Sequence, residues 1–107
     1  LRQPPDSEHD IAAIATLSLE VRENDNKINM LKGKAQYFGG ISFEEYDEYL
    51  QLLRKTNGQL NVILPMYAHM VEEEPTAAAN VSAILGANRL EEFVRLQVQV
   101  SDALMKS

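Results

Sequence analysis

The sequence of 107 residues contains no cysteine, and this absence excludes several kinds of site. Without cysteine there is no disulfide, no thiolate nucleophile and no cysteine-bound zinc. Long hydrophobic runs are also missing, since none approaches the roughly 20 residues that a membrane-spanning helix needs. We therefore expect no membrane span. Localisation stays unknown: cytoplasmic is the default expectation, and secretion is not excluded.

Positive charge is scarce. Ten lysine and arginine residues stand against sixteen acidic residues, which gives a net charge of −6 at pH 7. The basic residues are scattered and predict no basic face, so nucleic-acid binding through phosphate contacts is not expected. An acidic surface suits solubility or a basic protein partner. With 45% hydrophobic residues, the chain is large enough for one domain with its own core, spanning residues 1–107.

Only four prolines and five glycines interrupt the chain, and they delimit the expected helices. The Pro4-Pro5 pair predicts a disordered lead, Gly39-Gly40 a reversal of the chain, and Gly86 a helix end. Ser42 with Glu45 has the spacing of a capping box, as does Asn88 with Glu91. We expect a lead at 1–5 and helices over 6–38, 42–73, 76–85 and 89–106.

The second expected helix has two weak points. Asn57-Gly58 is a turn signal that could divide it, but the hydrophobic pattern keeps its phase across this dipeptide, which favours one continuous helix. Pro65 removes a backbone donor and clashes with the carbonyl of Asn61. A kink is therefore expected near 61–65.

Both halves of the segment 6–73 show the alternating three- and four-residue spacing of a coiled-coil seam. In the first half the seam residues are Ile14, Leu17, Val21, Asn24, Ile28, Leu31, Ala35 and Phe38. In the second half they are Phe43, Tyr46, Leu50, Leu53, Asn57, Leu60, Leu64, Tyr67 and Val71. In an antiparallel hairpin, the positions that face each other have numbers that add up to 81.

Asn24 and Asn57, the polar residues of this seam, would then oppose each other. A lone buried amide costs about 1–3 kcal/mol when it has no partner, whereas two opposed amides satisfy one another. The sequence therefore predicts that Asn24 and Asn57 lie side by side and set the register of the hairpin. The alternative is that two asparagines fall there by chance in an ordinary helical bundle.

The last expected helix carries hydrophobic residues over a wider arc than a single buried stripe. One side can dock on the open end of the hairpin over Ile63 and Met70, which leaves the tip half as a two-helix arm. Another side, including Phe93 and Val98, would then be free for a partner. The predicted fold is all-α: a long antiparallel coiled-coil-like hairpin with a short linking helix and a C-terminal helix packed on it, a three- to four-helix bundle.

The residues that could carry chemistry are few. His9 and His69 fall at outward positions and point away from each other, so they do not form a metal site. The sequence has no nucleophile motif and no phosphate-binding glycine loop. We therefore expect no enzyme activity, no cofactor and no small-molecule ligand.

Aromatic residues gather around the expected turn. Five of the seven Phe and Tyr residues lie within 37–49, and a two-helix arm cannot bury all of them. Ordinary capping of the hairpin end and a docking site for another protein explain this cluster equally well. The candidate interaction residues are Tyr37, Phe38, Ile41, Tyr49, Phe93 and Val98.

These patterns favour a non-enzymatic module for protein–protein interaction or assembly, with a protein partner or a second copy of itself. An alternative is a secreted helical-hairpin substrate or effector, since Phe38-Gly39-Gly40 at the turn resembles the Trp-x-Gly turn of hairpin substrates of mycobacterial-type secretion. Phe replaces Trp here, and the Tyr-x-x-x-Asp/Glu signal is missing. A third interpretation is a coiled-coil-tip regulator, since a finger with Glu44, Glu45 and Asp47 near its tip is similar to Gre-type transcript-cleavage factors.

Overall fold

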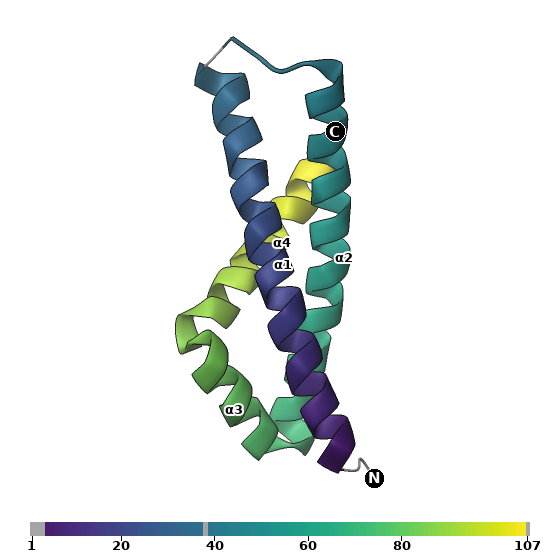
Figure 1. The fold of residues 1–107 in the computed structure, drawn as a ribbon, viewed down its shortest axis with the longest axis vertical. Helices are drawn as coiled ribbons and strands as arrows, with labels where there is room; N and C mark the ends of the chain where they lie inside the picture. Colours follow the sequence, from purple (N-terminus) through teal and green to yellow (C-terminus); the bar gives the residue numbers. More distant parts are fainter. Residues whose placement is uncertain (1–3, 38, 107) are drawn as a thin grey trace.

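The computed structural model describes residues 4–37 and 39–106, which form four α-helices and no strand (Figure 1). The helices are α1 (Pro4–Tyr37), α2 (Phe43–Glu73), α3 (Pro75–Leu85) and α4 (Ala87–Lys106). They pack into an elongated bundle that measures 53 × 21 × 19 Å. The all-α fold predicted from the sequence is confirmed.

The long helices α1 and α2 form the antiparallel hairpin. The backbone reverses at Gly39 and Gly40, whose φ angles of 84° and 112° are in the region that side-chain-bearing residues rarely adopt. α2 then begins with the expected capping box: the amide of Glu45 donates to the hydroxyl of Ser42, and the Glu45 carboxylate accepts from the amide of Ser42. Local sequence signals thus fix the end of the hairpin.

The first helix begins earlier than expected. α1 includes Pro4 and Pro5, although the sequence predicts that they belong to a disordered lead. Proline is tolerated in a first helical turn because the N–H groups of that turn have no intrahelical acceptor. Residues 1–3 and Phe38, the predicted last residue of this helix, lie outside the described residues.

α2 is continuous through Asn57-Gly58 and Pro65, as the hydrophobic phase predicts. The kink near 61–65 stays a prediction. α4 begins at Ala87, two residues before the predicted start at 89, so Asn88 lies within its first turn and not at the predicted N-cap. Gly86, with a φ of 89°, ends α3 and is the single residue between α3 and α4. Its carbonyl accepts a hydrogen bond from the amide of Arg89 in the first turn of α4.

The buried stripe of α2 is rotated from the predicted seam. The buried residues of α2 are Leu53, Thr56, Leu60, Ile63 and Met70. Leu53 and Leu60 are predicted seam positions, but Thr56, Ile63 and Met70 each come one residue before one. In α1 the predicted positions from Val21 to Leu31 are buried as expected. The rotation has a physical reason: α2 contacts α1, α3 and α4, and its buried face is a compromise between them.

The predicted pairing of Asn24 with Asn57 is wrong. The Asn24 amide donates to Gln59 Oε1 on α2 at 3.0 Å. Asn57 Oδ1 instead accepts from the Ser101 hydroxyl on α4 at 3.2 Å. Rotation of α2 turns Asn57 away from α1 and towards α4, so each amide finds a different partner.

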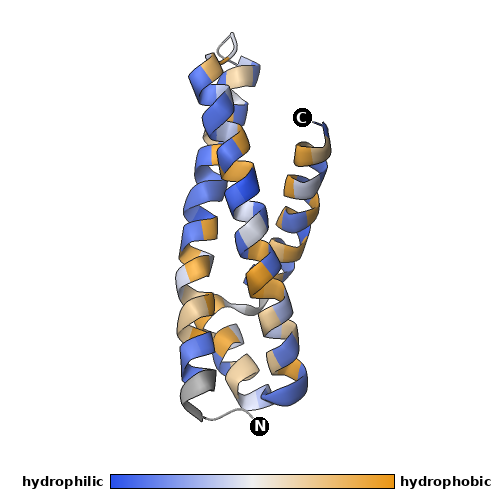
Figure 2. Ribbon diagram, turned by 90° about the vertical axis from the view of Figure 1, so that its right-hand side faces the viewer, coloured by the Kyte–Doolittle hydropathy of each residue, from blue (hydrophilic) through white to orange (hydrophobic). Residues whose placement is uncertain are grey.

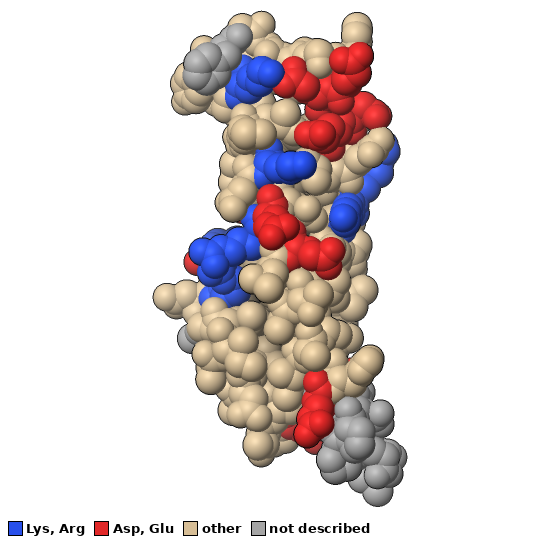
Figure 3. Space-filling model, in the orientation of Figure 1, with Lys and Arg blue, Asp and Glu red and all other residues tan. Residues whose placement is uncertain are grey.

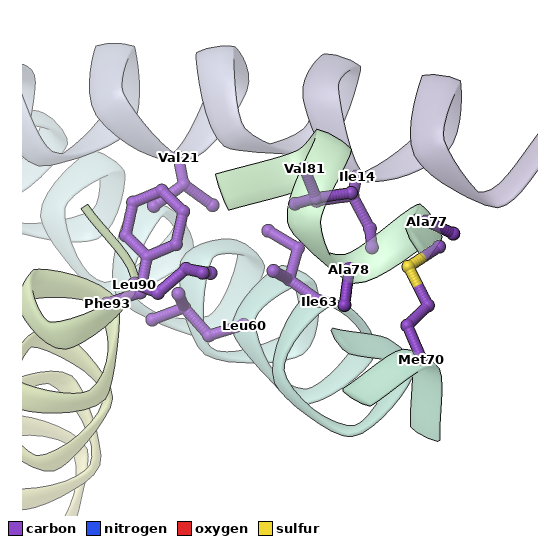
Figure 4. Packing of buried hydrophobic residues seen from close by; sticks show 10 residues of the cluster. All are labelled: Ile14, Val21, Leu60, Ile63, Met70, Ala77, Ala78, Val81, Leu90 and Phe93. Carbon is purple, nitrogen blue, oxygen red and sulfur yellow. The ribbon is translucent and has the colours of Figure 1, made fainter. Parts of the chain in front are cut away.

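The core has two parts along the bundle axis. At the open end of the hairpin, Ala77, Ala78 and Val81 of α3 lie against Ile14, Ile63 and Met70 (Figure 4). α3 therefore covers the open end, where the sequence pattern predicts the last helix. Its alanines allow this close approach, because a methyl group takes little space between helices.

α4 covers the middle of the hairpin and continues towards its tip. Leu90 and Phe93 lie beside Leu60 and Val21 (Figure 4). Two turns further on, Val100 packs with Ile28 and Leu53 in a second cluster that also includes Tyr49. Hydrophilic residues predominate along the upper part of the hairpin (Figure 2). α4 thus shields part of the region predicted to stand free as an arm.

Candidate functional site

α1 and α4 both pack on α2, but in the described part of the chain they do not approach each other closely along their backbones. A groove therefore lies between them, and we call it the tyrosine groove. Lys32, Tyr46 and Tyr49 are shared by its two connected parts. The part towards the turn has a volume of about 600 Å³ and is also lined by Leu31, Ala35, Gln36 and Ile41. The part beside α4 has a volume of about 400 Å³ and is also lined by Gln99, Asp102, Ala103 and Lys106.

A loss of packing near the turn creates this groove. Leu31 is buried, but one turn later Ala35 is exposed and contributes only a methyl group to the space that Tyr46 borders. A larger side chain at this seam position would fill the gap. Tyr46 consequently stays exposed, although the seam pattern predicts that it is covered.

Tyr46 and Tyr49 form the wall of the groove as a stacked pair. Their ring centroids are 6.2 Å apart and their planes are inclined by 29°. This arrangement is favourable for aromatic rings. Burial, with a smaller effect of Tyr46, raises the pKa of Tyr49 above its usual value. The hydroxyl groups of the two tyrosines can each donate or accept a hydrogen bond.

Most charged groups at the rim of the tyrosine groove form ion pairs with other residues of the same chain. Lys34 pairs with the Glu45 carboxylate and ties α1 to the first turn of α2. This bond and the Ser42 amide hold the pKa of Glu45 below its usual value. At the end of α4, Lys106 pairs with Asp102 at 2.9 Å. Among the described residues Lys32 makes no ion pair, so it is the cation of the groove that is free for a ligand.

Acidic side chains gather over the first turns of α2, with basic side chains beside them (Figure 3). The exposed acids of these turns are Glu44, Asp47 and Glu48. Within the part of the chain that the structure describes, no three His, Asp or Glu side chains are grouped as a metal site would require. Glu45, one of the tip carboxylates named for the coiled-coil-tip regulator, accepts a hydrogen bond from the Ser42 amide and pairs with Lys34. His9 and His69 are both exposed.

The structure separates the candidate interaction residues. Ile41 and Tyr49 line the groove, whereas Tyr37 is 73% exposed and does not line it. Phe93 is 3% exposed and belongs to the core, so its assignment as a contact surface is wrong. Its side chain fills the space between α1 and α2 beside Val21. Val98 is 66% exposed, and Phe38 lies outside the described residues.

Three functional candidates were missed from the sequence. The seam pattern predicts that Tyr46 and Phe43 are covered, but Phe43 is 93% exposed and Tyr46 lines the groove. The sequence pattern gives no signal that distinguishes Lys32 from the other surface lysines. The small Ala35 opposite Tyr46 in the seam was the signal that could have revealed the groove.

The groove continues along α4 into a second cavity, which Gln99 also lines. This cavity has a volume of about 240 Å³, and its charged lining residues are Arg22, Asp25, Arg89, Glu92 and Arg95. Burial is the main cause that raises the pKa of Asp25, with Glu92 adding to it and Lys32 opposing it. The slot between α1 and α4 is therefore aromatic towards the tip and charged towards α3.

None of the helices in the described range 4–37 and 39–106 is long and apolar enough to cross a membrane. Comparisons with protein-family models, with curated proteins and with solved structures find no match to this chain.

Proposed function

We propose that this protein is a protein–protein interaction module and that its tyrosine groove binds an α-helix of a partner protein. The observation that carries the proposal is the stacked, partly exposed pair of Tyr46 and Tyr49 in an open groove flanked by helices. α1, α2 and α4 already provide three walls, and a helix in the groove would complete a local four-helix arrangement. An amphipathic helix in an apolar groove is a recurring mode of peptide recognition.

The chemistry of the walls supports a protein ligand. Apolar and aromatic groups from Leu31, Ala35, Ile41 and the two tyrosines form the centre, and polar groups lie at the edges. Protein interfaces have this arrangement, and tyrosine is among the residues that contribute most to their affinity. A tyrosine side chain has few rotatable bonds, so ordering it on binding costs little conformational entropy.

The same lining predicts the sequence of the partner helix. Apolar residues spaced by three and four would face Ile41, Tyr46 and Tyr49, as in other helix-in-groove complexes. An acidic residue beside them would pair with Lys32, which makes no ion pair in the described part of the chain. The partner is therefore an amphipathic helix with at least one acidic residue on the edge of its apolar face.

Selection from a displayed library of helical peptides tests the proposal and requires no identified partner protein. Selected peptides should be amphipathic and should bind the wild-type protein at least about tenfold more tightly than the Ala35→Trp variant, a loss of about 1.4 kcal/mol or more. Ala35→Trp fills the groove from an exposed position, so the melting temperature should stay nearly unchanged. Tyr46→Ser should weaken binding in the same direction.

Tyr37→Ser is the matched control, since this tyrosine lies near the turn but outside the groove. It should leave peptide binding within about twofold of wild type. Peptides that bind wild type, Ala35→Trp and Tyr46→Ser equally well would show that the groove is not the binding site. Peptides that depend on Tyr37 instead would place the site at the turn itself.

A further inference from the structure

The outer face of α4 carries a stripe of exposed apolar residues that no element of the described chain covers. Val94, Val98 and Met105 are 53%, 66% and 86% exposed. Their spacings of four and seven residues keep them on one face of the helix over about 16 Å. We call these three residues the α4 stripe.

The α4 stripe is separate from the tyrosine groove. Ala103, which lines the groove, follows Val94 by nine residues, or two and a half helical turns, and therefore points to the opposite side of α4. On one flank of the stripe, Gln97 and Ser101 hydrogen-bond to Asn61 and Asn57 of α2. α2 thus borders the stripe on this flank, and the other flank is open.

The open flank carries charges in a self-complementary order. Along α4 these are Glu91, Arg95, Asp102 and Lys106, all exposed. Within one copy Asp102 and Lys106 already pair with each other at 2.9 Å, so pairs with a second copy would extend this ion pair into a network. If a second α4 packs on the stripe in the antiparallel direction, Val98 lies beside position 101 of the other copy and Val94 beside Met105. Arg95 then lies near Asp102 of the other copy, and Glu91 near Lys106. The two-fold axis repeats each pair, so four opposite-charge pairs form.

A parallel arrangement has the opposite electrostatics. Each residue would then lie beside its own equivalent, with Arg95 near Arg95 and Asp102 near Asp102, and like charges in register are destabilising. Exposed ion pairs contribute little affinity, but they select the orientation of the partner. The charge order therefore favours one arrangement of two copies.

We propose that this protein forms an antiparallel two-fold homodimer through the α4 stripe. A two-fold interface uses the same patch on both copies, and the pairing above meets that condition. Because each copy contributes three apolar side chains, the interface is small, and we expect a dissociation constant of about 10–100 µM. The apolar residues of this interface lie outside the tyrosine groove, whereas Asp102 and Lys106 lie at its α4 edge, so the dimer would border both grooves.

Sedimentation velocity over a range of about 5–500 µM tests the dimer. The wild-type protein should shift towards twice the monomer mass as the concentration rises. Val98→Glu should weaken self-association at least about tenfold, because it places a carboxylate in the centre of the apolar stripe. Val62→Glu is the matched control: Val62 is 47% exposed on α2, outside the stripe, and this variant should associate as wild type does. Circular dichroism should show unchanged helix content for both variants.

A charge exchange tests the antiparallel pairing. Arg95→Asp and Asp102→Arg should each weaken the dimer by about three- to tenfold, and the double variant should recover to within about twofold of wild type, because the pairs are restored with reversed sign. A protein that stays monomeric up to about 500 µM, or a dimer as sensitive to Val62→Glu as to Val98→Glu, would overturn the α4 interface. A double variant as weak as the single variants would overturn the antiparallel arrangement.

Discussion

Two adjacent residues of α4, Phe93 and Val94, should respond in opposite ways to replacement by alanine. Phe93 is 3% exposed and packs with Val21 and Leu60, whereas Val94 is 53% exposed. Truncating a buried phenylalanine typically costs about 3–5 kcal/mol, because it removes transfer free energy and leaves a cavity. The Val94 change removes only half-buried methyl groups, worth about 0.5 kcal/mol, and alanine's higher helix propensity partly offsets this loss.

The difference is large on the scale of this protein. A chain of this length has a free energy of unfolding of about 5–15 kcal/mol, so Phe93→Ala should remove a large part of it. At about 4 °C or more for each kcal/mol, its melting temperature should fall by at least about 12 °C. Val94→Ala should shift the melting temperature by no more than about 3 °C.

Urea titrations followed by circular dichroism at about 1 µM protein measure both changes, at a concentration where the proposed dimer is mostly dissociated. The slopes should stay equal to that of the wild type, so that midpoint differences report the free energy of unfolding. Equal losses for the two variants would refute the rotational setting of α4. A larger loss for Val94→Ala would mean that α4 docks on the hairpin through its other face.

Other properties of the structure can be tested in the same way. In a double-mutant cycle, Asn24→Ala and Gln59→Ala should show a coupling free energy of about 1 kcal/mol, because these side chains hydrogen-bond. The effects of Asn24→Ala and Asn57→Ala on the free energy of unfolding should instead add within about 0.5 kcal/mol. Coupling in the second cycle only would support the Asn24–Asn57 pairing predicted from the sequence. Ser42→Ala should lower the free energy of unfolding by about 1 kcal/mol in urea titrations, because it removes the N-cap of α2, and Ser101→Ala on the α4 surface should cost less. Burial raises the pKa of Asp25 in the folded state, so folding favours its protonated form. The stabilisation from this protonated form is fully present below the unfolded pKa of about 3.9 and is lost as the pH rises through the folded pKa. Asp25→Asn should therefore stabilise the protein more at pH 7 than at pH 3, and an equal effect at both pH values would contradict the raised pKa.

Local signals in the sequence determined the helices and the turn. The glycine pair, the Ser42–Glu45 capping box and the hydrophobic phase across Asn57-Gly58 each act within a few residues, so they give the same answer in any tertiary context. The all-α fold and the antiparallel hairpin follow from them. The heptad pattern of α1 also held from Val21 to Leu31, because this stretch faces mainly one neighbour, α2.

The tertiary structure alone decided which face of each helix is buried. α2 contacts three helices, and several of its apolar rows could serve as the centre of its buried stripe; packing of α3 and α4 selected the row that includes Thr56 and Ile63. That choice moved Asn57 from α1 to α4 and placed Phe93 in the core. It also left Tyr46 and Tyr49 beside the small Ala35, in a groove that no helix of the described chain fills. A periodic pattern specifies which residues share a face of a helix, but the neighbour that covers this face depends on contacts between segments far apart in the sequence.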